Sequence, residues 1–175
     1  KHEIRKAFHP QLKRLWEVDP NLNGLKADGP DGEIIPGWQV MATRFARMGY
    51  NFVPVATVGI SVIVGMEILF LRPDPPGGIL RSGDIDNRLK TLFDALKMPA
   101  STDELGGYDT PTPDESPFYV LLEDDRMVAH VAGETYCRWQ PTSTANGTFK
   151  ANDCRLIITL KIRPYEATLW NSYFA

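Results

Sequence analysis

The sequence has few cysteines, no membrane-length hydrophobic segment and no excess of positive charge. Its two cysteines, Cys137 and Cys154, could pair, but free thiols of a cytosolic protein are more common in a chain of this size. The longest apolar run, residues 58–71, contains Glu67 and two glycines and is too short to cross a bilayer as a helix. No signal peptide is visible. These features predict a cytoplasmic protein with no membrane partner.

Common nucleotide-binding patterns are also missing. The sequence contains no internal repeat, no Walker loop and no dinucleotide-binding fingerprint. Its 175 residues are 43% hydrophobic and 23% charged, which is ordinary for a globular protein with a sizeable core. We therefore expect a single domain over residues 1–175, with a helical N-terminal part over residues 1–50.

The net charge of −3 is unusual for a protein that binds DNA. Residues 99–117 contain five acidic residues and no lysine or arginine. The rest of the chain contains 17 acidic residues (22 minus 5) and 19 basic residues. The acidic excess is therefore regional, and the remaining surface is slightly basic.

Residues 83–97 combine an acidic start with an apolar helical face. Four residues recur at the spacing of one buried face: Leu89, Leu92, Phe93 and Leu96. The opposite stripe carries Asp86, Lys90 and Asp94. Asp86 is a candidate N-cap, and Asp84 precedes it by two residues. Taken alone, two acids at a helix start indicate a solvated, capped helix.

A second acidic pair changes this interpretation. Asp124 and Asp125 follow the apolar run 119–122 after one intervening residue, Glu123. Clustered carboxylates repel one another unless a cation neutralises them, and their hard oxygen ligands suit Mg²⁺ or Mn²⁺. We therefore expect a metal ion where the two acidic pairs meet.

The spacing of these residues resembles the RusA-type Holliday junction resolvases of bacteria and phages. The family motif is Asp-x-Asp-Asn-x-x-Lys, then Asp-Ala-Leu, then an Asp-Asp pair before a valine-containing strand. The resemblance covers residues 55–164 and rests on these positions: Asp84, Asp86, Asn87, Lys90, Asp94-Ala95-Leu96, Asp124-Asp125 and Val128.

The resemblance implies a RusA-like fold and a homodimer that hydrolyses branched DNA in recombination and repair, encoded by a bacterium or phage. It implies a Mg²⁺ ion, replaceable by Mn²⁺, bound by Asp84, Asp86 and Asp125, with Lys90 assisting catalysis. Around this site we expect three supporting side chains. Asn87 is a cap or an outer donor, Asp94 orients Lys90, and Asp124 is a further ligand or an outer-sphere group.

Candidate DNA-binding residues are Arg72, Arg81 and Arg88 near the motif, and Lys6 and Lys13 near the N-terminus. Family members often carry several arginines in the loop before the motif, where this chain has two. Residues 1–16 are basic and amphipathic, and Pro10 predicts a kink or two short helices. This basic face contacts either DNA or solvent. His2 and His9 are expected at the surface or as caps.

The remaining pattern predicts an α+β fold, a mixed or antiparallel sheet covered by helices. We expect a loop over residues 19–37 and a helix over 38–49. Residues 98–117, rich in Pro, Gly, Thr and Asp, predict a mobile insertion. Strands are expected at the following ranges: 57–72, 118–123, 126–139 and 154–163. Asn146-Gly147 is a candidate tight turn, and the aromatic tail 165–175 is expected to pack or form a dimer contact.

Two alternative functions remain open. One is a metal-dependent nuclease for flaps or other branched DNA. The other is a catalytically weak or inactive protein that only binds branched DNA, which the acidic balance and the small number of loop arginines favour. Three clustered aspartates and Lys90 favour an enzyme, because binding alone gains nothing from clustered acids.

Overall fold

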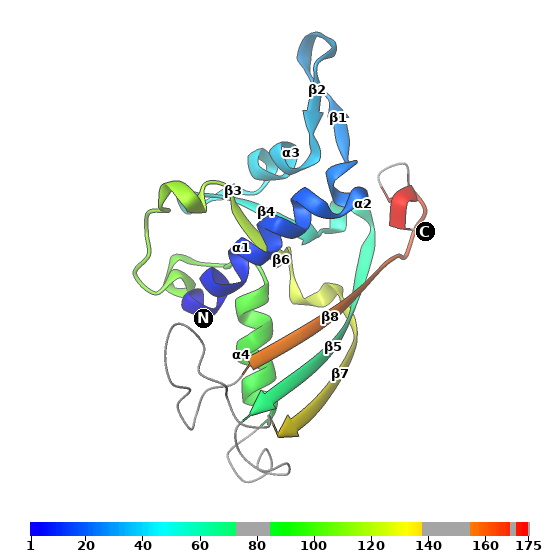
Figure 1. Cartoon of the computed structure of the whole chain (residues 1–175). Helices are drawn as coiled ribbons and strands as arrows, with labels where there is room; N and C mark the ends of the chain where they lie inside the picture. Colours follow the sequence, from blue (N-terminus) through cyan, green and yellow to red (C-terminus); the bar gives the residue numbers. More distant parts are fainter. Residues whose placement is uncertain (73–84, 138–154, 169–170, 175) are drawn as a thin grey trace.

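The structure is a computed structural model and describes residues 1–72, 85–137, 155–168 and 171–174 (Figure 1). The side chains of residues 72, 85, 86, 135–137 and 173 also lie outside the description. The predicted turn at Asn146-Gly147 therefore falls outside the described residues.

The fold is α+β, as predicted, and its described strands form three small sheets. A hairpin joins β1 (Lys26–Asp28) and β2 (Ile34–Pro36). The second sheet has the order β3 (Ala46–Arg47), β4 (Tyr50–Ala56), β6 (Phe118–Leu122), with β4 and β6 parallel. The third has the order β7 (Val128–Cys137), β5 (Val62–Arg72), β8 (Arg155–Pro164). In it, β5 is parallel to β7 and antiparallel to β8, so this sheet is mixed.

The helices are α1 (His2–Val18), α2 (Pro20–Asn23), α3 (Gly37–Arg44) and α4 (Ile85–Leu96). The main core joins α1 and α4 to one face of the third sheet (Figure 1). Alternation along β5 places one set of side chains in this core: Val62, Val64, Met66 and Ile68. The alternation along β8 predicted from the sequence is also present, with its apolar side chains half-buried. The predicted strands at 118–123, 126–139 and 154–163 thus correspond to β6, β7 and β8, and residues 138, 139 and 154 lie outside the described residues.

Helix α1 differs from the prediction because it continues through Pro10 as one element. It contributes buried side chains both before and after the proline, among them His9 and Leu12. Packing on both sides compensates for the hydrogen bond that a proline cannot make. The alternative of two short helices is therefore not observed.

His2 and His9 are buried, contrary to the surface location predicted for them. Both ring nitrogens of His9 are hydrogen-bonded. Its Nδ1 accepts from the Tyr119 N–H at 2.9 Å, and its Nε2 donates to the Asp114 carbonyl at 3.0 Å. The His2 ring stacks on Phe118. The sequence pattern missed both because the residues that bury them, such as Phe118 for His2 and Tyr119 for His9, lie more than a hundred residues away.

The burial of His2 predicts loss of stability in acid. Its pKa is lowered to about 4, mainly by burial and then by the Arg5 charge, with Lys6 lowering it further and Glu115 and Glu3 opposing. Because the unfolded chain protonates this histidine near pH 6.5, stability is complete above that pH and falls as the pH drops toward 4. The loss is about 3 kcal/mol. Urea unfolding of wild type and His2→Phe between pH 7 and 4 should show a difference that varies with pH. A constant difference would contradict the prediction.

The first half of the chain contains more structure than predicted. Residues 19–37 form α2 and the β1–β2 hairpin rather than a loop. The predicted helix over 38–49 ends at Arg44, and the chain then turns through Met48 and Gly49, both with positive φ, into β4. These short strands carry little alternation, which explains why the sequence did not indicate them.

The predicted strand over residues 57–72 begins later than expected. Val58–Ile60 form a 3₁₀ turn, and Ser61 adopts a left-handed conformation with φ of 51° before β5 starts. Val58 is therefore 54% exposed instead of lying in the sheet. The left-handed conformation of Ser61 changes the chain direction between β4 and β5. The apolar alternation in the sequence therefore includes residues of this turn as well as those of the strand.

Residues 98–117 pack closely against the rest of the chain. Leu105 is fully buried in a second apolar cluster, and Tyr50 Oη donates to the Tyr108 carbonyl at 2.9 Å. Glu115 forms an ion pair with Lys6 at 2.9 Å. These contacts argue against free motion of the predicted insertion.

Among the described residues, no helix combines the length and apolar character needed to span a membrane.

Candidate active site

An open pocket of about 670 Å³ lies between α4 and the start of β7. One wall comes from α4 and the other from the turn after β6 and the first residues of β7. Its lining residues are Asn87, Leu89, Lys90, Phe93, Asp94, Asp125, Val128 and Val131. The pocket therefore brings together residues of the helix motif and Asp125 of the second acidic pair, both of which the sequence singled out.

The long segment between α4 and β6 does not separate these two parts. Lys97, directly after α4, forms a parallel bridge with Leu122 at the end of β6, and Met98 N–H donates to the Leu122 carbonyl at 2.9 Å. Asp124 and Asp125 follow two residues later. The end of α4 and the acidic turn are thus joined directly, whatever the length of the chain between them.

The structure describes only part of the predicted metal site. Asp125 lines the pocket, whereas the side chain of Asp86 and all of Asp84 lie outside the described residues. The backbone of Asp86 belongs to the first turn of α4, directly before Asn87. Within the described part of the chain, no three His, Cys, Asp or Glu side chains are grouped so as to hold a metal.

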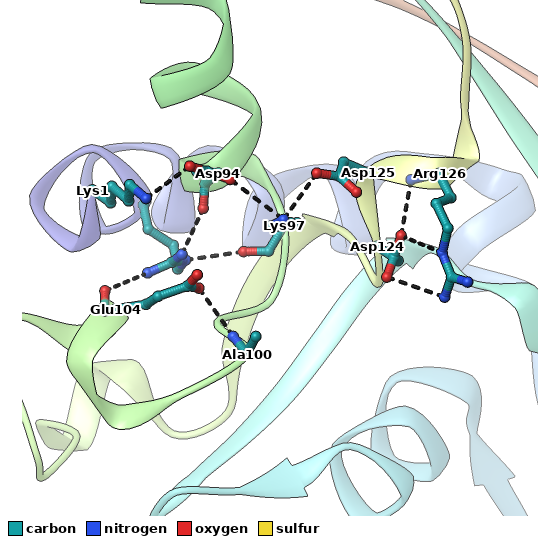
Figure 2. A network of polar contacts seen from close by, with 9 residues as sticks. Lys1, Asp94, Lys97, Ala100, Glu104, Asp124, Asp125 and Arg126 are labelled. Carbon is teal, nitrogen blue, oxygen red and sulfur yellow. Dashed lines mark hydrogen bonds and ion pairs between the residues drawn. The ribbon is translucent and has the colours of Figure 1, made fainter. Parts of the chain in front are cut away.

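Asp125 is held by a lysine that the sequence reasoning did not single out (Figure 2). Lys97 Nζ lies 2.9 Å from Asp125 Oδ2 and 3.3 Å from Asp94 Oδ1. The hydrogen bond with Asp125 is the main cause that raises the pKa of Lys97, so its ammonium remains charged. The Asp94–Lys97 spacing of i, i+3 was the available sequence signal.

Asp94 binds two lysines in the structure. Its Oδ2 lies 2.7 Å from Lys1 Nζ, and its Oδ1 faces Lys97. The hydrogen bond from Lys1 is the main cause that lowers the pKa of Asp94, and burial opposes it. The sequence suggested that Asp94 orients Lys90, but the contacts observed are with Lys1 and Lys97.

Asp124 stabilises the turn that presents Asp125. Its Oδ1 accepts from the Arg126 backbone N–H at 2.9 Å and from Arg126 Nε at 2.8 Å (Figure 2). These hydrogen bonds with Arg126 lower the pKa of Asp124, so the carboxylate stays ionised. Asp124 therefore caps the short 3₁₀ turn Asp125–Met127, and its carboxylate binds Arg126 rather than lining the pocket.

Buried Arg5 fixes the other end of the site helix. The side chain is 1% exposed, and its guanidinium donates to the Asp94 carbonyl at 2.8 Å and the Lys97 carbonyl at 3.1 Å. These carbonyls lie at the C-terminus of α4, where helical acceptors lack internal partners and a cation is favourable. The sequence pattern places Arg5 on the basic face of residues 1–16, which was expected to contact DNA or solvent, and the structure corrects this because Arg5 is buried.

The predicted DNA-binding residues have different surroundings. Lys6 is engaged within the protein by Glu115 and lies over the Tyr108 ring, whereas Lys13 and Arg88 are exposed. Arg81 and the side chain of Arg72 lie outside the described residues. Lys6 is therefore a poor candidate for DNA contact.

The described side-chain oxygens at the pocket are of the kind that can bind a hard cation. The Asp125 carboxylate is 45% exposed and faces the same pocket as the Asn87 amide, and such oxygens are the ligands that Mg²⁺ and Mn²⁺ accept. Lys97 uses one Asp125 oxygen, and a carboxylate has a second oxygen that can bind a metal.

Comparisons with protein-family models, with curated proteins and with solved structures each find no match to this chain.

Proposed function

We propose that this chain is a RusA-type nuclease, a structure-specific endodeoxyribonuclease that uses Mg²⁺, or Mn²⁺ in its place, to resolve four-way DNA junctions. The observation that carries the proposal is the pocket in which Lys90 and Asn87 of α4 meet Asp125. These residues belong to two motifs separated by more than thirty positions in the sequence. A RusA-type site would require these two motifs to lie close together.

The chemistry would be hydrolysis of a phosphodiester. When bound by Asp84, Asp86 and Asp125, Mg²⁺ supplies an activated water and offsets charge on the scissile phosphate. The water oxygen would lose a proton to solvent and form a bond to phosphorus, while the bond from phosphorus to one sugar oxygen breaks and that oxygen takes up a proton to leave as a hydroxyl. Lys90, exposed at the pocket, donates to the phosphate oxygens as their charge grows. Asn87 is placed to position a water or phosphate oxygen by hydrogen bonding.

The direct test is cleavage of a synthetic four-way junction, a flap and a linear duplex, each with Mg²⁺ or with EDTA. Junction cleavage that requires Mg²⁺ supports the proposal. Preferential cleavage of the flap would favour the related branched-DNA nuclease. Tight junction binding without cleavage of any substrate would favour a binding protein.

Resolution of a junction needs two opposed cuts, so the proposal includes a twofold homodimer. The apolar alternation over residues 58–70 would offer such a dimer a surface to share. In the structure its side chains from Val62 to Ile68 are buried in the core of the single chain. A dimer must therefore use another surface.

Lys90 provides a test of the catalytic assignment. Lys90→Ala should slow single-turnover cleavage of a pre-bound junction by about 10²- to 10³-fold, the scale for loss of one electrostatic donor. The melting temperature should change little, because Lys90 is exposed. Lys90→Arg should recover part of the rate, and Lys26→Ala on exposed β1 is the matched control. A Lys90→Ala rate within about twofold of wild type would exclude this role.

A further inference from the structure

The backbone of Lys97 is fixed from three directions. It directly follows α4, it bridges to Leu122 of β6, and its carbonyl accepts from Arg5 Nε of α1 at 3.1 Å. A side chain that starts from such an anchored backbone has a restricted reach. Lys97 therefore begins at the point where the site helix and the acidic turn are joined.

The side chain of Lys97 connects the two described carboxylates of the pocket. Its ammonium lies 2.9 Å from Asp125 Oδ2 and 3.3 Å from Asp94 Oδ1, and the side chain is only 19% exposed (Figure 2). Partial burial makes these contacts stronger and less screened by salt than those of an exposed pair. The contacts restrict the orientation of the Asp125 carboxylate relative to α4.

Asp125 needs such a restraint because its own position is exposed. Its side chain is 45% exposed and stands on a 3₁₀ turn of three residues. Asp124 stabilises the backbone of that turn through Arg126, but this contact does not orient the Asp125 carboxylate. Lys97 is the described residue that binds that carboxylate directly across the chain.

We propose that Lys97 is a positioning residue for metal binding, which holds the Asp125 carboxylate toward α4 so that its second oxygen can coordinate the ion. This rests on the proposed function. Lys97 acts through Asp125 and does not touch the phosphate, which distinguishes it from Lys90. Hydrogen bonds that orient a metal ligand change metal affinity by about 10- to 100-fold.

A positive charge near a metal site also has an opposing effect, because it repels the ion. Here the Asp94 carboxylate, whose Oδ1 lies 3.3 Å from Lys97 Nζ, partly neutralises the Lys97 charge. The repulsion between Lys97 and a bound cation is therefore reduced. We therefore expect the loss of orientation to exceed the relief of repulsion. The sign of the change in metal affinity decides between the two effects.

The experiment measures Mn²⁺ binding by electron paramagnetic resonance in protein without DNA, for wild type, Lys97→Met and Lys97→Arg. Lys97→Met keeps the apolar stem and removes the donors, so its Mn²⁺ dissociation constant should rise about 10- to 100-fold. Lys97→Arg should recover part of this loss. Lys26→Met, on exposed β1, should bind as wild type. In junction cleavage, the deficit of Lys97→Met should shrink as Mg²⁺ is raised.

The outcomes separate the two proposals. Unchanged or tighter Mn²⁺ binding by folded Lys97→Met, beside normal binding by wild type, would overturn the role of Lys97 and leave the nuclease proposal intact. Wild type that neither binds Mn²⁺ nor cleaves DNA would overturn both. If Lys97→Met fails to fold, Lys97→Arg decides: an affinity between those of wild type and Asp125→Asn supports the role of Lys97 in holding Asp125, and wild-type affinity would overturn it. A Lys97→Arg affinity as low as that of an Asp125→Asn protein would contradict it.

Discussion

Replacing Asp125 with asparagine is expected to reduce junction cleavage by more than about 10³-fold, because metal-ion stabilisation contributes several kcal/mol to the transition state. Asparagine has the same shape and keeps an oxygen that can accept from Lys97 Nζ. The fold should therefore persist, and the free energy of unfolding should change by less than about 1 kcal/mol for this half-exposed pair.

The measurement is single-turnover cleavage of a pre-bound four-way junction at saturating Mg²⁺, with Asp28→Asn on exposed β1 as the matched control. Asp86→Asn should show a similar loss if Asp86 completes the ligand set. Junction binding by both variants should remain close to that of wild type, because the lost step is chemical. Cleavage by Asp125→Asn within tenfold of wild type would remove Asp125 from the metal site.

The helix at the centre of the proposed site was predictable from local sequence. The spacing of Leu89, Leu92, Phe93 and Leu96 predicted a helix over 83–97, and α4 is observed over Ile85–Leu96. Period-two alternation likewise predicted β8. Both signals are strong because every residue that faces the core is apolar, so the pattern reports burial directly.

Polar residues that become buried were not predictable in this way. Arg5, His2 and His9 are charged or polar in the sequence and so were assigned to the surface. Arg5 and His9 are buried because partners from distant segments satisfy them, such as the Asp94 carbonyl for Arg5 and the Tyr119 N–H for His9, whereas the His2 ring packs against the rings of Tyr50 and Phe118. A single sequence contains no local signal for partners about ninety to one hundred and ten residues away.

In the candidate site too, some residues were predictable from local sequence and others depend on contacts formed by folding. The sequence identified Lys90, Asn87 and Asp125, which line one pocket. It did not identify Lys97, because the contact with Asp125 depends on the bridge between Lys97 and Leu122 that forms only in the folded chain. Composition alone also suggested that residues 98–117 move freely, whereas Leu105 is fully buried.

Arg5→Met is expected to cost about 3–5 kcal/mol of unfolding free energy, the scale for removing one member of a buried charged network. Methionine keeps an apolar stem but donates no hydrogen bonds. The carbonyls of Asp94 and Lys97 would lose their bonds to Arg5 at the end of α4, and a buried acceptor without a partner costs about 1–3 kcal/mol.

The control for this prediction is Arg14→Met on the same helix, because Arg14 is exposed and pairs with Glu17 within α1. Its loss should cost at most about 0.5 kcal/mol. Urea denaturation of both variants measures the difference directly. Arg5→Lys should fall between Arg5→Met and wild type, because one ammonium cannot reproduce the spread of donors that reaches two carbonyls. A cost below about 1 kcal/mol for Arg5→Met, the usual net contribution of one hydrogen bond, would show that α4 is held by its apolar face alone.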